Sequence, residues 1–215
     1  MRKDEKSKSQ RAINDLPSDD ERTFWNKKYD EGPHKWLNPD PFLAEAYSEF
    51  LSGVTPGIAL DLAGGGGRHT LWLAERGWHL TLMDVSDVGV ALARKTFENH
   101  LPFTAPVPRT KLVDLTSFRD LGKKQFDLIV VFYYLQRELF SALISALKPG
   151  AHLIYKTYTI EQLRLQGGPG HSRFLLQPNE LLRAFSSLRI LYYRERTKDK
   201  AVAELVAVKG SEPPE

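Results

Sequence analysis

From residue 57 onward, short apolar runs alternate with longer segments in which apolar side chains recur at helical spacing. The apolar runs predict strands at residues 58–62, 78–85, 110–113, 126–132 and 151–155. The segments between them predict crossover helices at residues 68–75, from Ser86 onward and at 138–147. Strands that alternate with helices in this way form a parallel sheet with helices on both faces.

The chain on either side of this core follows other patterns. Residues 42–51 and 178–185 predict further helices, and residues 188–195 and 201–208 predict an antiparallel hairpin with a short charged turn. We therefore expect an α/β fold with a Rossmann-like, doubly wound sheet that is mostly parallel and ends in an antiparallel hairpin. A single domain would span residues 21–210, with an N-terminal helical lid and flexible tails at 1–20 and 211–215.

The helix that Ser86 caps shows how the pattern predicts burial. Its apolar positions Val88, Ala91 and Leu92 fall on one face, which we expect to pack against the sheet. Residues 126–132 are continuously apolar after Asp127, as a strand covered on both faces should be.

A run of four glycines, Gly64 to Gly67, directly follows the first predicted strand, and the next helix begins at Arg68. Glycine tolerates positive φ and lets a ligand approach the backbone, while a helix start offers unpaired N–H groups. This arrangement is typical of nucleotide-type sites in α/β proteins.

Three aspartates lie at the carboxyl ends of predicted strands: Asp61, Asp84 and Asp114. A single aspartate after a strand is usually a cap or turn residue, so three on one edge are more informative than one. Ligands of doubly wound sheets bind at that edge, near the point where the strand order reverses.

Two nucleotide chemistries fit the glycine run poorly. The sequence has no Gly-x-x-x-x-Gly-Lys-Ser/Thr, which excludes a P-loop phosphate site. A dinucleotide fingerprint needs a third glycine where His69 or Thr70 stands. Asp84 would still suit a ribose, so an NAD-dependent oxidoreductase stays open as an alternative.

Composition narrows the protein class further. The 215 residues include no cysteine, which excludes disulfides, thiolate metal sites and a cysteine nucleophile. No apolar run approaches the roughly 20 residues of a membrane helix, and no apolar segment of signal-peptide type follows the N-terminus. The net charge is +3, but the basic residues form no dense cluster, which disfavours a nucleic-acid partner. The expectation is a cytoplasmic enzyme or binding protein with no membrane association and no metal; the oligomeric state is left open.

At these residues the chain resembles the class I S-adenosylmethionine-dependent methyltransferases, whose sheet has seven strands. Asp61-x-Ala63-x-Gly65-x-Gly67 is similar to their first motif, Asp/Glu-x-Gly/Ala-x-Gly-x-Gly. Asp84 matches the acid that ends their second strand, and Asp114-Leu115 matches their third-strand motif. The run 126–135 matches their fourth-strand motif, and Leu147-Lys-Pro-Gly matches the segment that leads into their fifth strand. The resemblance covers residues 24–208.

The resemblance implies S-adenosylmethionine as the cofactor. The glycine turn would pack against its methionine part, Asp84 would bond both ribose hydroxyls, and Asp114-Leu115 would contact the adenine. Asp61 would hold the amino group or only fix the loop. Trp25 and Tyr29 would cover the cationic sulfonium, or would only pack against one end of the sheet. The implied cofactor set is Asp61, Ala63, Gly64, Gly65, Gly67, Arg68, Asp84, Val85, Asp114, Leu115, Phe132, Trp25 and Tyr29.

More narrowly, the chain resembles small bacterial methyltransferases related to the tellurite-resistance and thiopurine enzymes. The features are Trp25-Asn-Lys-Lys-Tyr29, Arg68-His69, Tyr134-Leu-Gln-Arg137-x-x-Phe140 and Tyr155-Lys-Thr-Tyr-Thr159. Gln136 and Lys156 depart from that branch, which has a histidine and an acid there. The acceptor chemistry of the branch therefore does not carry over.

The predicted reaction is methyl transfer to a small-molecule acceptor, or to a thiol or metalloid. Acceptor-side candidates follow the fourth and fifth strands: Tyr133, Tyr134, Gln136, Arg137, Lys156, Tyr158 and His171. We single out Tyr134, Arg137 as an anchor for an anionic acceptor, and His171 as a general base. Arg137 could equally pair with Glu138 or Glu161, and His171 could be solvated. A protein that binds the cofactor but has no acceptor pocket is a further alternative.

Overall fold

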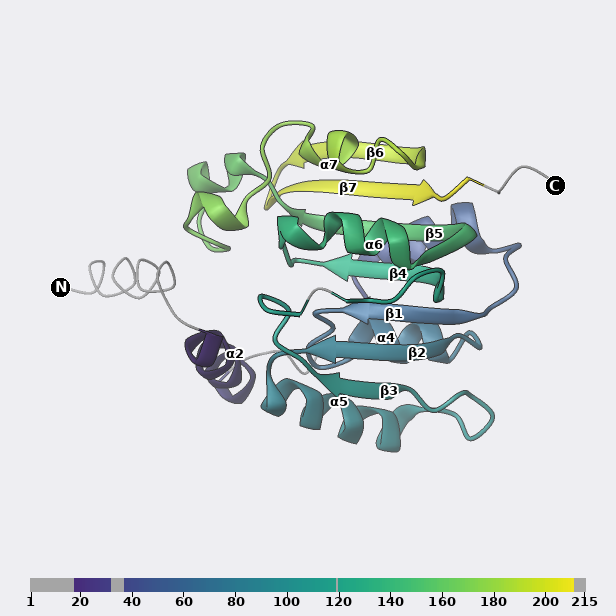
Figure 1. The fold of residues 1–215 in the computed structure, drawn as a ribbon. Coiled ribbons are helices and arrows are strands. Elements are labelled where there is room, and N and C mark those ends of the chain that lie inside the picture. The colour runs from purple at the N-terminus through teal and green to yellow at the C-terminus, as the bar shows by residue number, and fades with distance from the viewer. Residues whose placement is uncertain (1–17, 32–36, 119, 211–215) are drawn as a thin grey trace.

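The computed structural model describes residues 18–31, 37–118 and 120–210. Its centre is a seven-stranded sheet in the order β3-β2-β1-β4-β5-β7-β6 (Figure 1). The strands are β1 (Ile58–Leu62), β2 (His79–Asp84), β3 (Arg109–Leu112), β4 (Phe126–Phe132), β5 (Leu147–Tyr158), β6 (Arg189–Thr197) and β7 (Ala201–Val208). The strands β1 to β5 pair in parallel, and β7 pairs antiparallel with both β5 and β6. The predicted fold class is confirmed.

Helices cover both faces of the sheet. They are α2 (Ser18–Glu31), α3 (Pro41–Ala46), α4 (Arg68–Ala74), α5 (Asp87–His100), α6 (Phe140–Ala146) and α7 (Glu180–Ala184). In Figure 1, α6 lies in front of the sheet and α4 behind it. Alternate residues of β4 enter different cores: Leu128 packs with the α3 and α4 side, and Ile129 with the α6 side. Both faces of β4 are thus buried, which explains its unbroken apolar run.

The ligand edge of this sheet is the end at which the parallel strands finish. The strand order reverses between β1 and β4, so a crevice is expected outside the carboxyl ends of these two strands. In Figure 1 these ends point to the left, and α2 lies beyond them. None of the helices in the described ranges is long and apolar enough to cross a membrane.

The predicted buried face of α5 is wrong. Ala91 is exposed and Val88 and Leu92 are only half-buried. The buried positions are Gly89, Val90, Ala93, Thr96 and Phe97. A Cβ added at Gly89 would lie 2.9 Å from a ring carbon of Tyr29, so the small residue allows α2 and α5 to approach each other closely. A search for large apolar residues overlooks such a face.

Three element boundaries also differ from the prediction. The strand predicted at 151–155 is β5, which runs from Leu147 to Tyr158 with an irregularity in its pairing to β4 that accommodates Pro149. The helix predicted at 138–147 begins as a 3-10 turn before α6. The helix predicted at 42–51 is α3 followed by a π-helical turn at Tyr47–Leu51. Most of the predicted tails lies outside the described residues.

Candidate active site

The residues that follow the two central strands have strained backbones. Ala63, directly after β1, has a φ of 56°, and Tyr133, directly after β4, has a φ of 58°. A left-handed φ in a non-glycine residue costs free energy, and such residues cluster where a site needs a particular loop shape. Because β1 and β4 also flank the reversal of strand order, both observations point to the same crevice.

The glycine loop between β1 and α4 presents bare backbone to this crevice. Gly65 has a φ of 53°, and its N–H donates to Oδ2 of Asp84 at 2.8 Å. A Cβ added at Gly65 would lie 1.8 Å from the hydroxyl of Tyr29. Gly67 has a φ of 81°, and a Cβ there would lie 2.7 Å from the ring of Phe97. Neither position accommodates a side chain without movement of its neighbours.

Two buried carboxylates beside the loop have no ion-pair partner within the described part of the chain. Asp84 accepts from the N–H groups of Gly65 and Ser86, at 2.8 and 2.9 Å, and burial raises its pKa. Asp61 accepts from the Thr70 hydroxyl at 2.7 Å through Oδ2, while its Oδ1 is buried without a hydrogen-bond partner. Burial raises the pKa of Asp61 to about 7 against the effect of the Thr70 bond.

A cavity of about 650 Å³ opens above the loop at the carboxyl edge. Predicted cofactor residues among its lining are Trp25, Tyr29, Ala63, Gly64, Arg68, Asp84, Val85, Leu115 and Phe132. Asp61, Gly65 and Gly67 are not part of the lining, although Gly65 and Gly67 belong to the loop and Asp61 lies directly beside it. Asp114 also stands outside the lining, and its Oδ1 accepts from the backbone N–H and the hydroxyl of Thr116. The structure thus gathers most of the predicted cofactor set in one place.

The helix α2 covers this cavity and is held by polar contacts to α5. Asn26 donates to Asp87 at 2.7 Å and accepts from the hydroxyl of Ser86 at 2.7 Å. Phe24, Trp25 and Tyr29 from the same helix line the cavity. The helix is therefore positioned as the predicted lid.

The acceptor-side candidates separate into two groups. Tyr134 lines the cavity, and its hydroxyl is buried without a hydrogen-bond partner in the described chain. His171 also lines it, but its Nδ1 accepts from the N–H of Arg173 at 3.1 Å, which occupies the lone pair that a base would use. Arg137 is outside the lining.

Arg137 is committed to contacts within the protein. Its Nε and Nη2 donate to the two carboxylate oxygens of Glu180, at 2.6 and 2.9 Å. Further bonds go to the carbonyls of Arg173 and Leu175. This bidentate geometry favours a structural role, with Glu180 as the partner rather than Glu138 or Glu161.

Sequence reasoning did not single out several residues of the site. Lys28 and Glu21 line the cavity from α2, and Lys200 reaches it from the turn between β6 and β7. Asp40 lies buried and bonded to Tyr133 and Lys156. No spacing signal links these residues, because they come from segments far apart in the chain. Among the described side chains, no group of three or more His, Asp and Glu is arranged to hold a metal ion.

The residues fit S-adenosylmethionine on observations of this structure. Gly64 and Gly66 of the loop line the cavity and present bare backbone to a ligand there, and the buried Oδ1 of Asp61 has no partner in the described chain and retains the capacity to accept from an ammonium group. Each carboxylate oxygen of Asp84 retains acceptor capacity beyond its bond to the backbone. Aromatic rings on α2 face the same cavity and suit a sulfonium cation.

Comparison with known proteins agrees with this geometry. Residues 59–150 match a family model described as a methyltransferase domain. A comparison with curated protein sequences finds no match. The structure is similar to magnesium protoporphyrin IX methyltransferase (ChlM) from Synechocystis PCC 6803 with bound SAH, with a TM-score of 0.70 and 17% identity over 90% of this chain and 99% of that chain.

Two other solved structures show the same fold. N-methyltransferase NodS from Bradyrhizobium japonicum WM9, in complex with S-adenosyl-L-homocysteine, has a TM-score of 0.66 and 19% identity over 87% of this chain and 97% of that chain. TehB from Haemophilus influenzae has a TM-score of 0.62 and 17% identity over 86% of this chain and 67% of that chain. The predicted methyltransferase resemblance is confirmed for residues 59–150, and the solved structures confirm the predicted fold. S-adenosylmethionine is the cofactor that such a domain implies.

Proposed function

Because residues 59–150 match a methyltransferase domain, we propose that this chain transfers the methyl group of S-adenosylmethionine to a small-molecule acceptor, which includes a thiol or a metalloid. The observation that carries the proposal is the cavity of about 650 Å³ between the glycine loop and the aromatic face of α2. The cofactor would supply an electrophilic methyl group on a sulfonium. The chain would align the acceptor with that carbon and exclude water.

On the cofactor side, we assign a part to each buried carboxylate. Asp84 would accept from the ribose hydroxyls while it holds the N–H of Gly65. Asp61 would take the amino group on its free Oδ1, which requires the carboxylate to be ionised. Leu115 would pack against the adenine, while Asp114 shapes the turn that presents it. Trp25 and Tyr29 would cover the sulfonium.

On the acceptor side, we propose Tyr134 as the contact residue. Its side chain lines the cavity, its buried hydroxyl has no hydrogen-bond partner in the described chain, and burial raises its pKa, so it stays protonated at neutral pH. It can therefore donate a hydrogen bond to an acceptor atom. Tyr134 would thereby orient a lone pair of that atom towards the methyl group that the cofactor would supply, and any proton of the acceptor would leave to solvent.

The fold alone does not decide the reaction. The [4+2]-cyclase SpnF is also similar to this chain, with a TM-score of 0.62 and 18% identity over 79% of this chain and 80% of that chain. The competing functions are a protein that binds the cofactor but has no acceptor pocket, and an NAD-dependent oxidoreductase, and both are tested below.

The test has a binding step and a turnover step. S-adenosylhomocysteine should raise Tm and bind in calorimetry, whereas NADH should do neither. Transfer of label from methyl-labelled S-adenosylmethionine to a panel of phenols, thiols, amines and chalcogen oxyanions should then reveal an acceptor, and Tyr134→Phe should slow it. Binding without transfer to any class would favour the non-catalytic alternative, and a response to NADH alone would overturn the proposal.

A further inference from the structure

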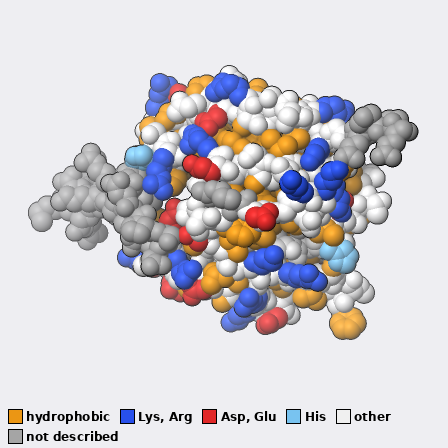
Figure 2. All heavy atoms as spheres, viewed as in Figure 1, with side chains coloured by type: hydrophobic (Ala, Val, Ile, Leu, Met, Phe, Trp, Pro, Cys, Tyr) orange, Lys and Arg blue, Asp and Glu red, His pale blue; other side chains and the backbone are white. Residues whose placement is uncertain are grey.

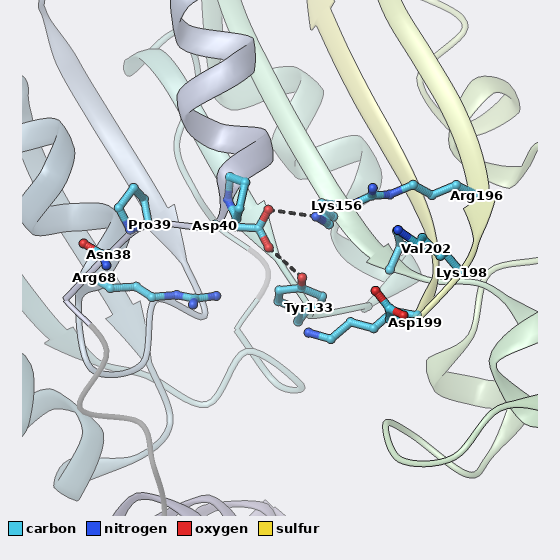
Figure 3. Close-up of a pocket in the computed structure, with 12 residues that line it drawn as sticks. Asn38, Pro39, Asp40, Arg68, Tyr133, Lys156, Arg196, Lys198, Asp199 and Val202 are labelled. Atoms are coloured by element: carbon cyan, nitrogen blue, oxygen red, sulfur yellow. Dashed lines mark hydrogen bonds and ion pairs between the residues drawn. The ribbon is translucent and has the colours of Figure 1, made fainter.

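A second cavity of about 580 Å³ adjoins the first and shares its walls with it. Arg68, Tyr133 and Lys200 line both cavities. The remaining lining of the second cavity is Asn38, Pro39, Asp40, Pro41, Lys156, Arg196, Lys198, Asp199 and Val202 (Figure 3). The two cavities are therefore neighbours, separated or joined at these three side chains; we call them the cofactor end and the second end of the ligand space.

The floor of the second cavity is an ionic network in which Lys156, Asp40 and Glu204 are buried. Nζ of Lys156 donates to Oδ1 of Asp40 at 2.7 Å, and the hydroxyl of Tyr133 donates to Oδ2 at 2.6 Å (Figure 3). The ammonium of Lys156 also lies 3.1 Å from a carboxylate oxygen of Glu204. Lys156 is 3% exposed and Glu204 is fully buried. The charges of the floor are therefore satisfied within the protein.

The rim is different: Arg196 pairs with Glu204 at 3.2 Å, but three other cations of the lining have no carboxylate partner in the described chain. Arg68, Lys198 and Lys200 form no ion pair within the described residues. In Figure 3, Arg68 extends towards the cavity from the glycine-loop side, opposite the hairpin. Lys200 lies over the ring of Tyr133, 4.5 Å from its centroid. Asp199 is the one carboxylate of the lining outside the network, and it is exposed.

The surroundings of Lys200 carry charges of both signs. Burial lowers the pKa of Lys200 most, the carboxylate of Asp40 raises it, and the charges of Lys156 and Arg68 lower it further. The N–H of Lys198 donates to the carbonyl of Lys200 at 3.3 Å, which fixes the turn that carries both side chains. Elsewhere the basic residues are dispersed: on the face shown in Figure 2, Lys and Arg alternate with acidic and apolar side chains.

We propose that the methyl acceptor carries an oxyanion, a carboxylate or a phosphate, which binds in the second cavity between Arg68, Lys198 and Lys200. The rest of the acceptor would then pass Tyr133 into the first cavity and reach the methyl group. This inference rests on the proposed methyl transfer, since it names the substrate class of the same site. Fixed cations at one end of the space would orient the acceptor as well as bind it.

Three matched probes test it: benzoate, phenyl phosphate and the neutral benzamide. Each is titrated by NMR into protein saturated with S-adenosylhomocysteine. We expect the anions to bind at least about tenfold more tightly than benzamide, with the stronger of the two identifying the oxyanion. The double variant Lys198→Met/Lys200→Met should lose this preference, and Lys95→Met, which changes an exposed lysine on α5, should keep it. Equal binding of all three probes, no anion binding, or an unchanged preference in the double variant would each overturn the inference.

Binding of S-adenosylhomocysteine keeps the two proposals apart. Wild type and the single variant Lys198→Met should bind it with the same affinity, because Lys198 lines only the second cavity. If S-adenosylhomocysteine binds and the anions do not, only the acceptor inference fails. If it does not bind while the anions bind in a Lys198- and Lys200-dependent manner, the proposed function fails and an anion site remains.

Discussion

The two ends of the ligand space differ in the charged side chains that have no ion-pair partner. At the cofactor end, Asp84 lines the cavity and Asp61 lies close by, both without an ion pair in the described chain, and burial raises the pKa of both. At the other end, Arg68, Lys198 and Lys200 line the cavity without an ion pair in the described chain. There the one buried acid of the lining, Asp40, behaves differently: burial would raise its pKa, but hydrogen bonds from Lys156 and Tyr133 outweigh this and lower it.

This difference indicates which chemical group of a ligand each end would bind. A buried carboxylate with no cation favours a ligand that brings an ammonium or hydroxyl groups, whereas cations with no carboxylate favour an anion. Lys156 and Asp40 satisfy each other, so they serve as the floor of the second cavity and leave its anion-binding capacity to the other cations. Four variants test this comparison, from the largest expected effect to the smallest.

The buried network of Lys156, Asp40 and Glu204 should matter most for stability. Lys156→Met leaves Asp40 and Glu204 buried without their shared cation, and we expect unfolding to become easier by about 3 kcal/mol at pH 7. The lowered pKa of Asp40 means that its contribution is present above its ordinary pKa of 3.8 and is lost as the pH falls through the folded value. The deficit measured by urea denaturation should therefore shrink below pH 4.

The control for this variant is Lys148→Met. Lys148 pairs with Asp127 at the same distance, 2.7 Å, but both side chains are about one-third exposed. Its removal should cost less than about 1 kcal/mol. Equal losses in the two variants would show that the buried network is not special.

The glycine loop should matter most for cofactor affinity. Gly65→Ala places a side chain at positive φ and against Tyr29, so S-adenosylhomocysteine should bind at least about tenfold more weakly in calorimetry. Gly53→Ala, a position with no heavy atom within 4 Å of the added Cβ, should leave the affinity unchanged. Wild-type affinity in Gly65→Ala would contradict a ligand seated on this backbone.

The pKa of Asp61 predicts a pH dependence of binding. With a pKa of about 7, the ionised fraction rises about tenfold between pH 6 and pH 8, and the affinity for S-adenosylhomocysteine should rise in parallel. Stability follows the opposite direction, because a raised pKa stabilises the fold below the ordinary value of 3.8 and this contribution is lost as the pH rises through about 7. Asp61→Asn should flatten both profiles, and a binding profile that persists in this variant would rule out Asp61 as its source.

The lid should give the smallest effect. Tyr29→Ala removes an aromatic face over the cofactor and should weaken S-adenosylhomocysteine binding about fivefold, while Tyr29→Phe should retain most of the affinity. Unchanged affinity in Tyr29→Ala would mean that the ring only fills space beside Gly65 and Gly89.

The same division explains what could be predicted from the sequence. The strands, the hairpin and the cofactor end follow local patterns: an apolar run, a glycine run, an acid after a strand. The positively charged end has no such pattern, because Asp40, Lys156 and Lys200 meet only through tertiary folding. The face of α5 was missed for a related reason, since Gly89 and Ala93 are buried for their small size and not for their hydrophobicity.

The turn between β6 and β7 spans only residues 198–200, and its two lysines reach the acceptor end from outside the β1–β4 half of the sheet. The strands that carry it are joined by an unbroken antiparallel ladder from Tyr192 to Ala201, which tolerates sequence change at its tip. Acceptor preference can therefore diverge between descendants of this protein through a few codons, without disturbing the part of the gene that encodes the cofactor loop. For protein engineering, this makes the turn the first segment to randomise when a new acceptor is sought.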